Sequence, residues 1–129
     1  MMRDQKLWTW HLAAGLVILF LLGLHMVVMH LDAVIHLAGL NPHGKPIAWD
    51  NVLARGKHAA FAVTYVLLLG AALFHGLYGL RNIVFELDPA TWLKRTVNAV
   101  LLLGGFGLFV FGTWAAIASL ALARAAQGM

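Results

Sequence analysis

The most informative chemical feature of the sequence is a histidine, His75, near the end of a long apolar run. That run extends from Ala59 to Leu80 and contains no Lys, Arg, Asp or Glu. An imidazole inside hydrocarbon has no water to satisfy its ring nitrogens, so it usually holds a ligand or a polar partner. Gly79 lies one helical turn later on the same face and leaves room for a flat group beside the imidazole. With Arg81 near the membrane surface, the arrangement suits a metal-bearing ring with acidic side groups.

The composition is that of a membrane protein. The chain has 129 residues, of which 62% are hydrophobic and only 11% are charged. Soluble domains are about half apolar and about a quarter charged. The absence of cysteine excludes disulfides, iron–sulfur ligation by this chain and a covalently attached c-type haem. The formal charge of +4 gathers at segment ends rather than in a basic run, which argues against nucleic-acid binding.

Three runs free of Lys, Arg, Asp and Glu cover residues 12–31, 59–80 and 97–123. A bilayer core of about 30 Å needs roughly twenty helical residues, and helices are the structure that satisfies the backbone of such segments in lipid. The first run is too long for a removable signal peptide and carries His25 in its middle. We therefore predict an all-α membrane protein with a single anchor domain over residues 1–129. Its three transmembrane helices should cover roughly residues 10–36, 57–84 and 93–123.

The ends of the three runs carry residues that typically mark the ends of transmembrane helices. Trp8, Trp10 and Trp92 precede spans, where interfacial aromatics are common. Prolines and glycines break the chain at residues 41–46, and Asp88 or Thr91 is expected to cap the third helix. A cytoplasmic N-terminus places slightly more Lys and Arg on the inner side, so the sequence leans toward that orientation.

The histidines are not equivalent. His11, His25 and His36 fall near one face of the first helix together with Asp32, and such a polar stripe must face protein, cofactor or water. His25 is the deepest of them. The remaining histidines are expected to be solvated, at a membrane surface or on another side of the helix; they are His30, His43 and His58.

The two deep histidines lie at different depths. Counted from Trp8, His25 is about 25 Å along its helix, whereas His75 is about 16 Å from the same membrane face, counted from Glu86. They are therefore too far apart to hold one metal. If both are ligands, they serve two cofactors, and each needs a second ligand from elsewhere. The alternative for His25 is a hydrogen bond to a neighbouring helix, as polar groups make in membrane bundles.

Bis-histidine haem suits these residues better than other metal centres. Neutral imidazole binds iron, and the porphyrin is an apolar disc that fits between helices. Its propionates would pair with Arg81, or with Lys94 and Arg95. Most of the glycines are explained by ordinary helix packing, and Gly79 is the exception.

At these residues the chain resembles the membrane-anchor cytochrome b of succinate:quinone and fumarate:quinone oxidoreductases. The similar segments are Phe74-His75-Gly76-Leu77-Tyr78-Gly79-Leu80-Arg81, followed by Glu86, and in the first helix Trp10-His11-Leu12-Ala13-Ala14-Gly15 and Leu24-His25-Met26-Val27-Val28. In the diheme members, one chain of five helices carries four haem-ligating histidines. This chain is similar to one half, from roughly Trp8 to Ala115.

The resemblance implies that the three helices form half of a haem-binding bundle. His75 would ligate one haem b and His25 a second, both shared with a partner subunit; in a single-haem member His75 alone would be a ligand. Gly79 and Arg81 would line the haem site. A menaquinone or ubiquinone would bind near the inner membrane face, at His11, Trp10, Asn82 or Arg81.

The resemblance also implies a non-catalytic electron-transfer subunit of succinate dehydrogenase or fumarate reductase in the cytoplasmic membrane. Its partners would be a second hydrophobic anchor subunit supplying the opposing histidines, an iron–sulfur subunit and a flavoprotein subunit. Two alternatives are a cytochrome b of a hydrogenase or nitrate-reductase type complex, and an anchor without cofactors. A third is a Cu(I)-handling membrane protein, because residues 25–30 contain two histidines and two methionines.

Overall fold

The computed structural model describes residues 2–37, 48, 50 and 56–126. These residues form three long helices, α1 (Met2–Leu37), α3 (Ala59–Glu86) and α4 (Thr91–Ala125). All three contain stretches long and apolar enough to cross a membrane. The predicted all-α class is confirmed, although α1 begins nearer the N-terminus than residue 10. His43 and most of the connection between α1 and α3 lie outside the described residues, as do the side chains of Met29, Asp32 and His36.

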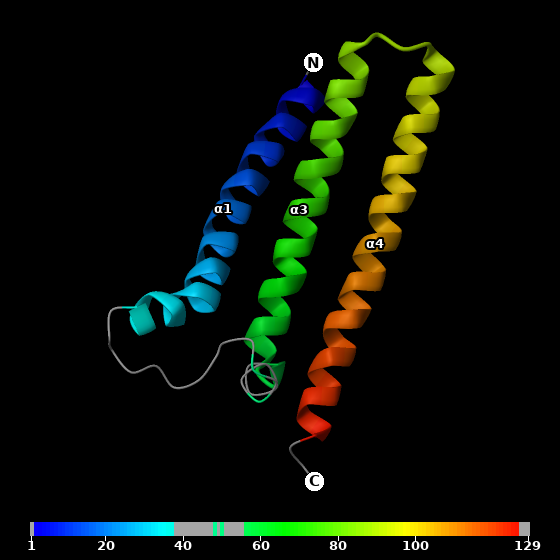
Figure 1. Cartoon of the computed structure of the whole chain (residues 1–129). Coiled ribbons are helices and arrows are strands. Elements are labelled where there is room, and N and C mark those ends of the chain that lie inside the picture. The colour runs from blue at the N-terminus through cyan, green and yellow to red at the C-terminus, as the bar shows by residue number, and fades with distance from the viewer. Residues whose placement is uncertain (1, 38–47, 49, 51–55, 127–129) are drawn as a thin grey trace.

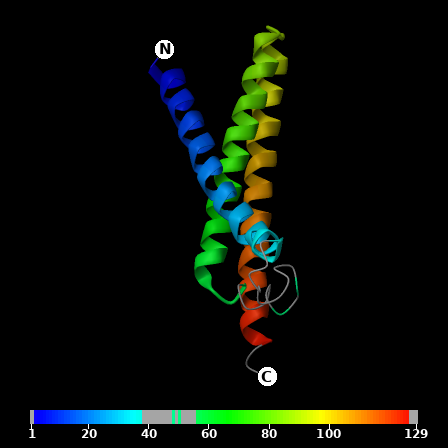
Figure 2. The same ribbon diagram turned by 60° about the vertical axis from the view of Figure 1, so that its left-hand side comes forward.

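Helix α3 is the centre of the arrangement. It packs against α1 on one side and against α4 on the other, and within the described residues α1 and α4 do not touch. The N-terminus and the short α3–α4 connection lie at one end of the molecule, and α4 ends at the other (Figure 1). Figure 2 shows that α4 runs nearly antiparallel to α3, whereas α1 crosses α3 at a marked angle.

Glycines bring α3 and α4 close together. Gly105 on α4 receives the side chain of Leu77, and Gly112 receives that of Leu69. On α3, a methyl group at Gly70 would lie 3.2 Å from the ring of Phe109. Small residues that admit large neighbours are the usual basis of helix association in lipid, where no hydrophobic force drives helices together. These glycines therefore have the ordinary packing role that the sequence suggested.

The connection between α3 and α4 corrects one prediction. The N-cap of α4 is Ala90, and neither Asp88 nor Thr91 caps the helix with its side chain. The Asp88 carboxylate instead accepts a hydrogen bond and ion pair from Lys94 Nζ at 2.7 Å. Asp88 also has a left-handed backbone, with φ of 44°. Because its carboxylate is engaged by Lys94, the carboxylate is not used to cap the amides of α4.

Very little of the chain is buried. Its accessible surface is 9757 Å², compared with about 6,700 Å² expected from size scaling for a folded soluble monomer of this mass. Among the described residues only Ala123 is buried, and most large apolar side chains are exposed. Such a surface is stable only when lipid or other protein covers it.

Replacing Gly112 with valine should weaken the α3–α4 contact. The added methyl groups meet the whole Leu69 side chain, and overpacking of this kind costs about 1–3 kcal/mol. The matched control is Gly107→Val on the same helix, where a Cβ has nothing within 4 Å. Thermal unfolding of the chain in detergent should show a lower midpoint for Gly112→Val alone. Equal midpoints for the two variants would contradict this packing.

The Asp88–Lys94 pair should make stability depend on acid pH. The hydrogen bond from Lys94 and its positive charge hold the pKa of the Asp88 carboxyl below its usual value. A lowered pKa in the folded state gives stability that is present above the unfolded pKa of about 3.9 and lost as the pH falls through the folded value.

The measurement is the unfolding midpoint of the chain between pH 5 and pH 2.5. Asp88→Asn should reduce the loss of stability on acidification, and asparagine tolerates the left-handed backbone of this position. Lys94→Gln should reduce the loss to the same extent. If both variants lose as much stability between pH 5 and pH 2.5 as the unsubstituted chain, the Asp88–Lys94 pair does not contribute to stability.

Candidate functional site

Two histidines from different helices stack where α1 crosses α3. The imidazoles of His11 and His75 are nearly parallel, with centroids 4.0 Å apart and planes 5° from each other. Tyr78 leans against His11 at 5.3 Å, and Phe74 stacks on Tyr78 at 5.7 Å. Four flat rings therefore form a continuous row. Both histidines are half-buried rather than exposed to the surroundings.

A hydrogen bond across the helices selects one tautomer of the neutral His75 ring. Its Nδ1 lies 3.0 Å from the main-chain carbonyl oxygen of His11. A carbonyl oxygen can only accept, so Nδ1 must carry the proton and donate it. In the neutral imidazole, Nε2 then has no proton and presents a free lone pair. This is the form in which histidine binds a metal.

Two glycines make the stack possible. A methyl group at Gly15 would lie 3.0 Å from Cε1 and 3.2 Å from Nδ1 of His75. A methyl group at Gly79 would lie 3.4 Å from Cε1 of His11. Each helix therefore provides a glycine against which the histidine of the other helix packs. In the structure, the His11 ring lies beside Gly79.

His11 itself leaves one polar atom without a partner. Its Nδ1 is buried and has no hydrogen bond to any described residue. Buried polar atoms are nearly always paired, so an unpaired one marks a place where a further group is expected. The site around the stack is therefore incomplete in the isolated chain.

His25 lies at a different level. Its half-buried ring meets the ring of Tyr65 edge-on, with centroids 6.3 Å apart and planes 69° from each other. Since fourteen residues separate His11 and His25 on α1, His25 is about 21 Å along the helix from the stack. The two deep histidines therefore occupy different depths, as the sequence indicated. Met26 is 49% exposed and His30 is exposed, so neither shares the surroundings of His25.

Arg81 faces α4 rather than the histidine stack. Its Nε donates to Asn98 Oδ1 at 2.7 Å, and Nη1 donates to Asn82 Oδ1 at 3.2 Å. The guanidinium also lies 4.3 Å from the centre of the Phe85 ring, a cation–π contact. Because Asn98 accepts through its oxygen, its amide nitrogen remains free to donate elsewhere.

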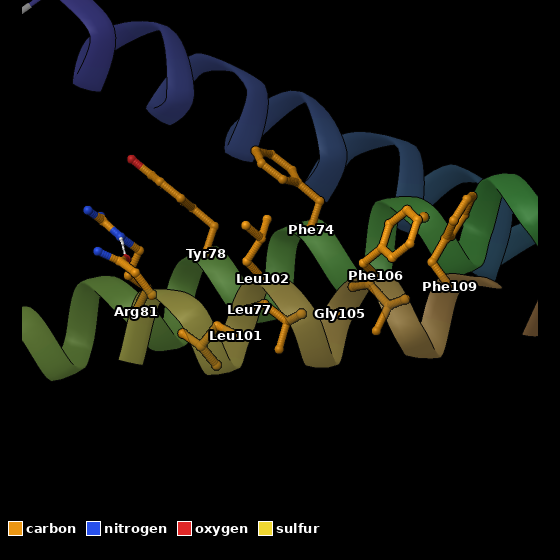
Figure 3. A pocket seen from close by; sticks show the side chains of 12 residues that line it. Phe74, Leu77, Tyr78, Arg81, Leu101, Leu102, Gly105, Phe106 and Phe109 are labelled. Carbon is orange, nitrogen blue, oxygen red and sulfur yellow. Dashed lines mark hydrogen bonds between the residues drawn. The ribbon is translucent and has the colours of Figure 1, made fainter. Parts of the chain in front are cut away.

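Arg81 lies at one end of an apolar groove of about 400 Å³ between α3 and α4 (Figure 3), and Asn98, its hydrogen-bond partner, also lines the groove. Phe106 and Phe109 lie at the other end. The full lining is Gly70, Leu73, Phe74, Leu77, Tyr78, Arg81, Asn98, Leu101, Leu102, Gly105, Phe106 and Phe109. The groove therefore combines an apolar body with hydrogen-bond donors near the membrane surface.

Only one of the predicted quinone-site residues lines the groove. Arg81 lines the groove, whereas His11, Trp10 and Asn82 do not. Trp10 is 67% exposed. Sequence reasoning missed Tyr78 and Asn98, which line the groove, and Gly15, which receives His75. The spacing of Gly15 was a usable signal, because His11 and Gly15 repeat on α1 the four-residue spacing of His75 and Gly79 on α3.

Within the described part of the chain, no three His, Cys, Asp or Glu side chains gather closely enough to hold a metal ion.

Together, the three apolar helices, the exposed apolar surface and the paired polar groups between helices define a multi-pass all-α membrane protein. The chain is similar to the succinate dehydrogenase hydrophobic membrane anchor subunit of Thermoplasma acidophilum, with 27% identity over 100 residues. The matched region covers 77% of this chain and 73% of that protein. No protein family profile matches the chain, and no solved structure matches it.

Proposed function

We propose that this chain is a membrane-anchor subunit of a succinate:quinone oxidoreductase that holds haem b and forms part of a quinone site. The observation that carries the proposal is His75, an imidazole within a membrane span whose Nδ1–H is held by a carbonyl of the neighbouring helix. The similarity to a succinate dehydrogenase anchor subunit supports the assignment to this complex. Its task is electron transfer rather than dicarboxylate chemistry.

The residues around His75 fit a haem iron. The hydrogen bond to the His11 carbonyl leaves Nε2 as the free ligand atom, and the surrounding helices supply an apolar environment. Haem b, when bound, supplies a one-electron redox centre. His75 is the proposed axial ligand from this chain, and a histidine of a second hydrophobic anchor subunit is the proposed opposing ligand. Gly79 faces His11, so its proposed role is to admit that ring rather than to contact the porphyrin.

His25 is the proposed ligand of a second haem b. Its half-buried ring contacts only the edge of Tyr65 among the aromatic side chains of the described region. Its level, about 21 Å along α1 from the histidine stack, is consistent with two separate centres across the bilayer.

The groove between α3 and α4 is the proposed quinone site. Quinone carbonyls accept hydrogen bonds, and the end of the groove carries the guanidinium of Arg81, the amide of Asn98 and the side chain of Tyr78. The apolar remainder suits an isoprenoid tail of menaquinone or ubiquinone. Arg81 is therefore assigned to the quinone rather than to a haem propionate. Since Tyr78 also contacts His11, the groove adjoins the histidine stack.

The exposed apolar surface of the helices is the proposed interface with lipid and with the second anchor subunit. An iron–sulfur subunit and a flavoprotein subunit would dock at the end that holds the N-terminus and the α3–α4 connection. That end carries Lys6, Arg81, Lys94 and Arg95, in accord with a cytoplasmic location in a cell inner membrane. A cytochrome b of another respiratory complex would share the haem proposal, but the Thermoplasma relative favours succinate dehydrogenase.

Replacing His75 with alanine should abolish the haem signal of its centre. The complex of this chain with its partner subunits is purified, and its reduced-minus-oxidised absorption spectrum is recorded. We expect two b-type haems in the unsubstituted complex, one fewer or none in His75→Ala, and one fewer in His25→Ala. His58→Ala, an exposed histidine at the start of α3, is the matched control and should keep the full signal. A spectrum unchanged by His75→Ala would refute the ligand assignment.

Replacing Arg81 with glutamine should weaken quinone use. A charge-assisted hydrogen bond contributes about 1.5–3 kcal/mol, so the KM for quinone should rise roughly 10- to 100-fold. Asn98→Leu should raise it in the same direction. The matched control is Arg95→Gln, an exposed basic residue at the same end of the bundle. The assay is succinate:quinone reductase activity of the complex, with haem content measured in parallel; an unchanged KM in Arg81→Gln would remove the groove as the quinone site.

A further inference from the structure

The structure contains a reciprocal arrangement on α1 and α3. On each helix a histidine is followed four residues later by a glycine, His11 with Gly15 and His75 with Gly79. The helices run in opposite directions, so each histidine meets the glycine of the other helix. Gly15 faces the His75 ring, and Gly79 faces the His11 ring.

We propose that His11 and Gly15 are positioning residues that hold His75 in one tautomer and one orientation before any cofactor binds. The proposal rests on the proposed function, because it treats His75 as the haem ligand of this chain. It adds two residues of α1 to that site, His11 through its main-chain carbonyl and Gly15 through its lack of a side chain.

The carbonyl of His11 is able to act in this way because it has two lone pairs. Gly15 lies four residues after His11 in the same helix, so its amide uses one lone pair of that carbonyl in the helical hydrogen bond. The second accepts the Nδ1–H of His75 at 3.0 Å. The missing side chain of Gly15 favours this approach, because a Cβ there would lie 3.2 Å from Nδ1 and would push the imidazole back by a few tenths of an ångström.

The stacked rings fix the orientation of His75. Rotation of the imidazole about its Cβ–Cγ bond would move Nδ1 away from the carbonyl and destroy the parallel contact with His11. His11 is itself supported by Tyr78, which is supported in turn by Phe74. Nε2 is the nitrogen farther from α1, at 4.0 Å from the Cβ position of Gly15. The hydrogen bond therefore places the proton on Nδ1, the nitrogen beside α1, and leaves Nε2 unprotonated.

Such a bond should also influence the ligand electronically. A hydrogen bond from Nδ1–H to an acceptor makes the imidazole a stronger donor through Nε2, as groups behind metal-bound histidines generally do. Loss of the bond should therefore make the metal centre easier to reduce. This is a consequence that a purely space-filling role of Gly15 would not produce.

The first test uses the full chain in lipid bilayers without haem, with histidine labelled by nitrogen-15. Solid-state NMR should show His75 protonated at Nδ1 and bare at Nε2, with the signals assigned by their absence in His75→Gln. Gly15→Ala should give a mixture of the two tautomers. Gly23→Ala, on the same helix, is the matched control because nothing lies within 4 Å of a Cβ there. His11→Phe should keep the tautomer, because it retains the main-chain carbonyl and a flat ring.

The second test uses the assembled complex. In Gly15→Ala the midpoint potential of the His75 haem should rise relative to the unsubstituted complex, and in Gly23→Ala it should not change. An unchanged tautomer and an unchanged potential in Gly15→Ala would overturn the proposal. If Gly15→Ala does not insert into the membrane, the NMR spectrum of the unsubstituted chain still tests the proposal. His75 protonated at Nε2 in that spectrum would overturn it. A complex without haem would refute the proposed function, whereas the NMR result would still report on the positioning.

Discussion

The close approach of α1 and α3 is the constraint on which the rest of the structure depends. Lipid offers no hydrophobic force between helices, so their association relies on tight packing and on hydrogen bonds. Gly15 and Gly79 supply the tight packing, and the bond from His75 to the His11 carbonyl supplies the polar contact. A Cβ at Gly15 would press on the His75 ring from 3.0 Å, and separation of the helices would remove the only recorded hydrogen-bond partner of His75 in the described region.

Helix α3 presents different residues to its two neighbouring helices. His75 and Gly79 face α1, whereas Leu77 and Arg81 face α4. Tyr78 lies between these faces, since it contacts His11 and also lines the groove. An electron carrier held at His75 and a quinone in the groove would therefore be neighbours. This adjacency gives the proposed electron transfer a physical route within a single helix.

The isolated chain is incomplete in ways that point to an assembly. Its accessible surface exceeds that expected for its mass, and His11 Nδ1 is buried without a partner among the described residues. His75 and His25 each offer one imidazole at its own depth. The proposed second hydrophobic subunit would cover part of the apolar surface and supply the opposing ligands.

Sequence alone determined the class of protein and the fact that its two deep histidines lie at different levels. Charge-free runs long enough to cross a bilayer predict helices reliably, because lipid allows few other structures, and helical rise then places His25 and His75 at different levels. The spacing of His75 and Gly79 also indicated room for a flat cofactor ring. Tertiary structure decided that His11 lies beside Gly79, that His75 lies beside Gly15 and that Arg81 pairs with Asn98. It also showed that Asp88 binds Lys94 instead of capping α4. These contacts join residues far apart in the chain or depend on local turn geometry. The periodicity of one helix does not indicate which residues of another helix will contact it.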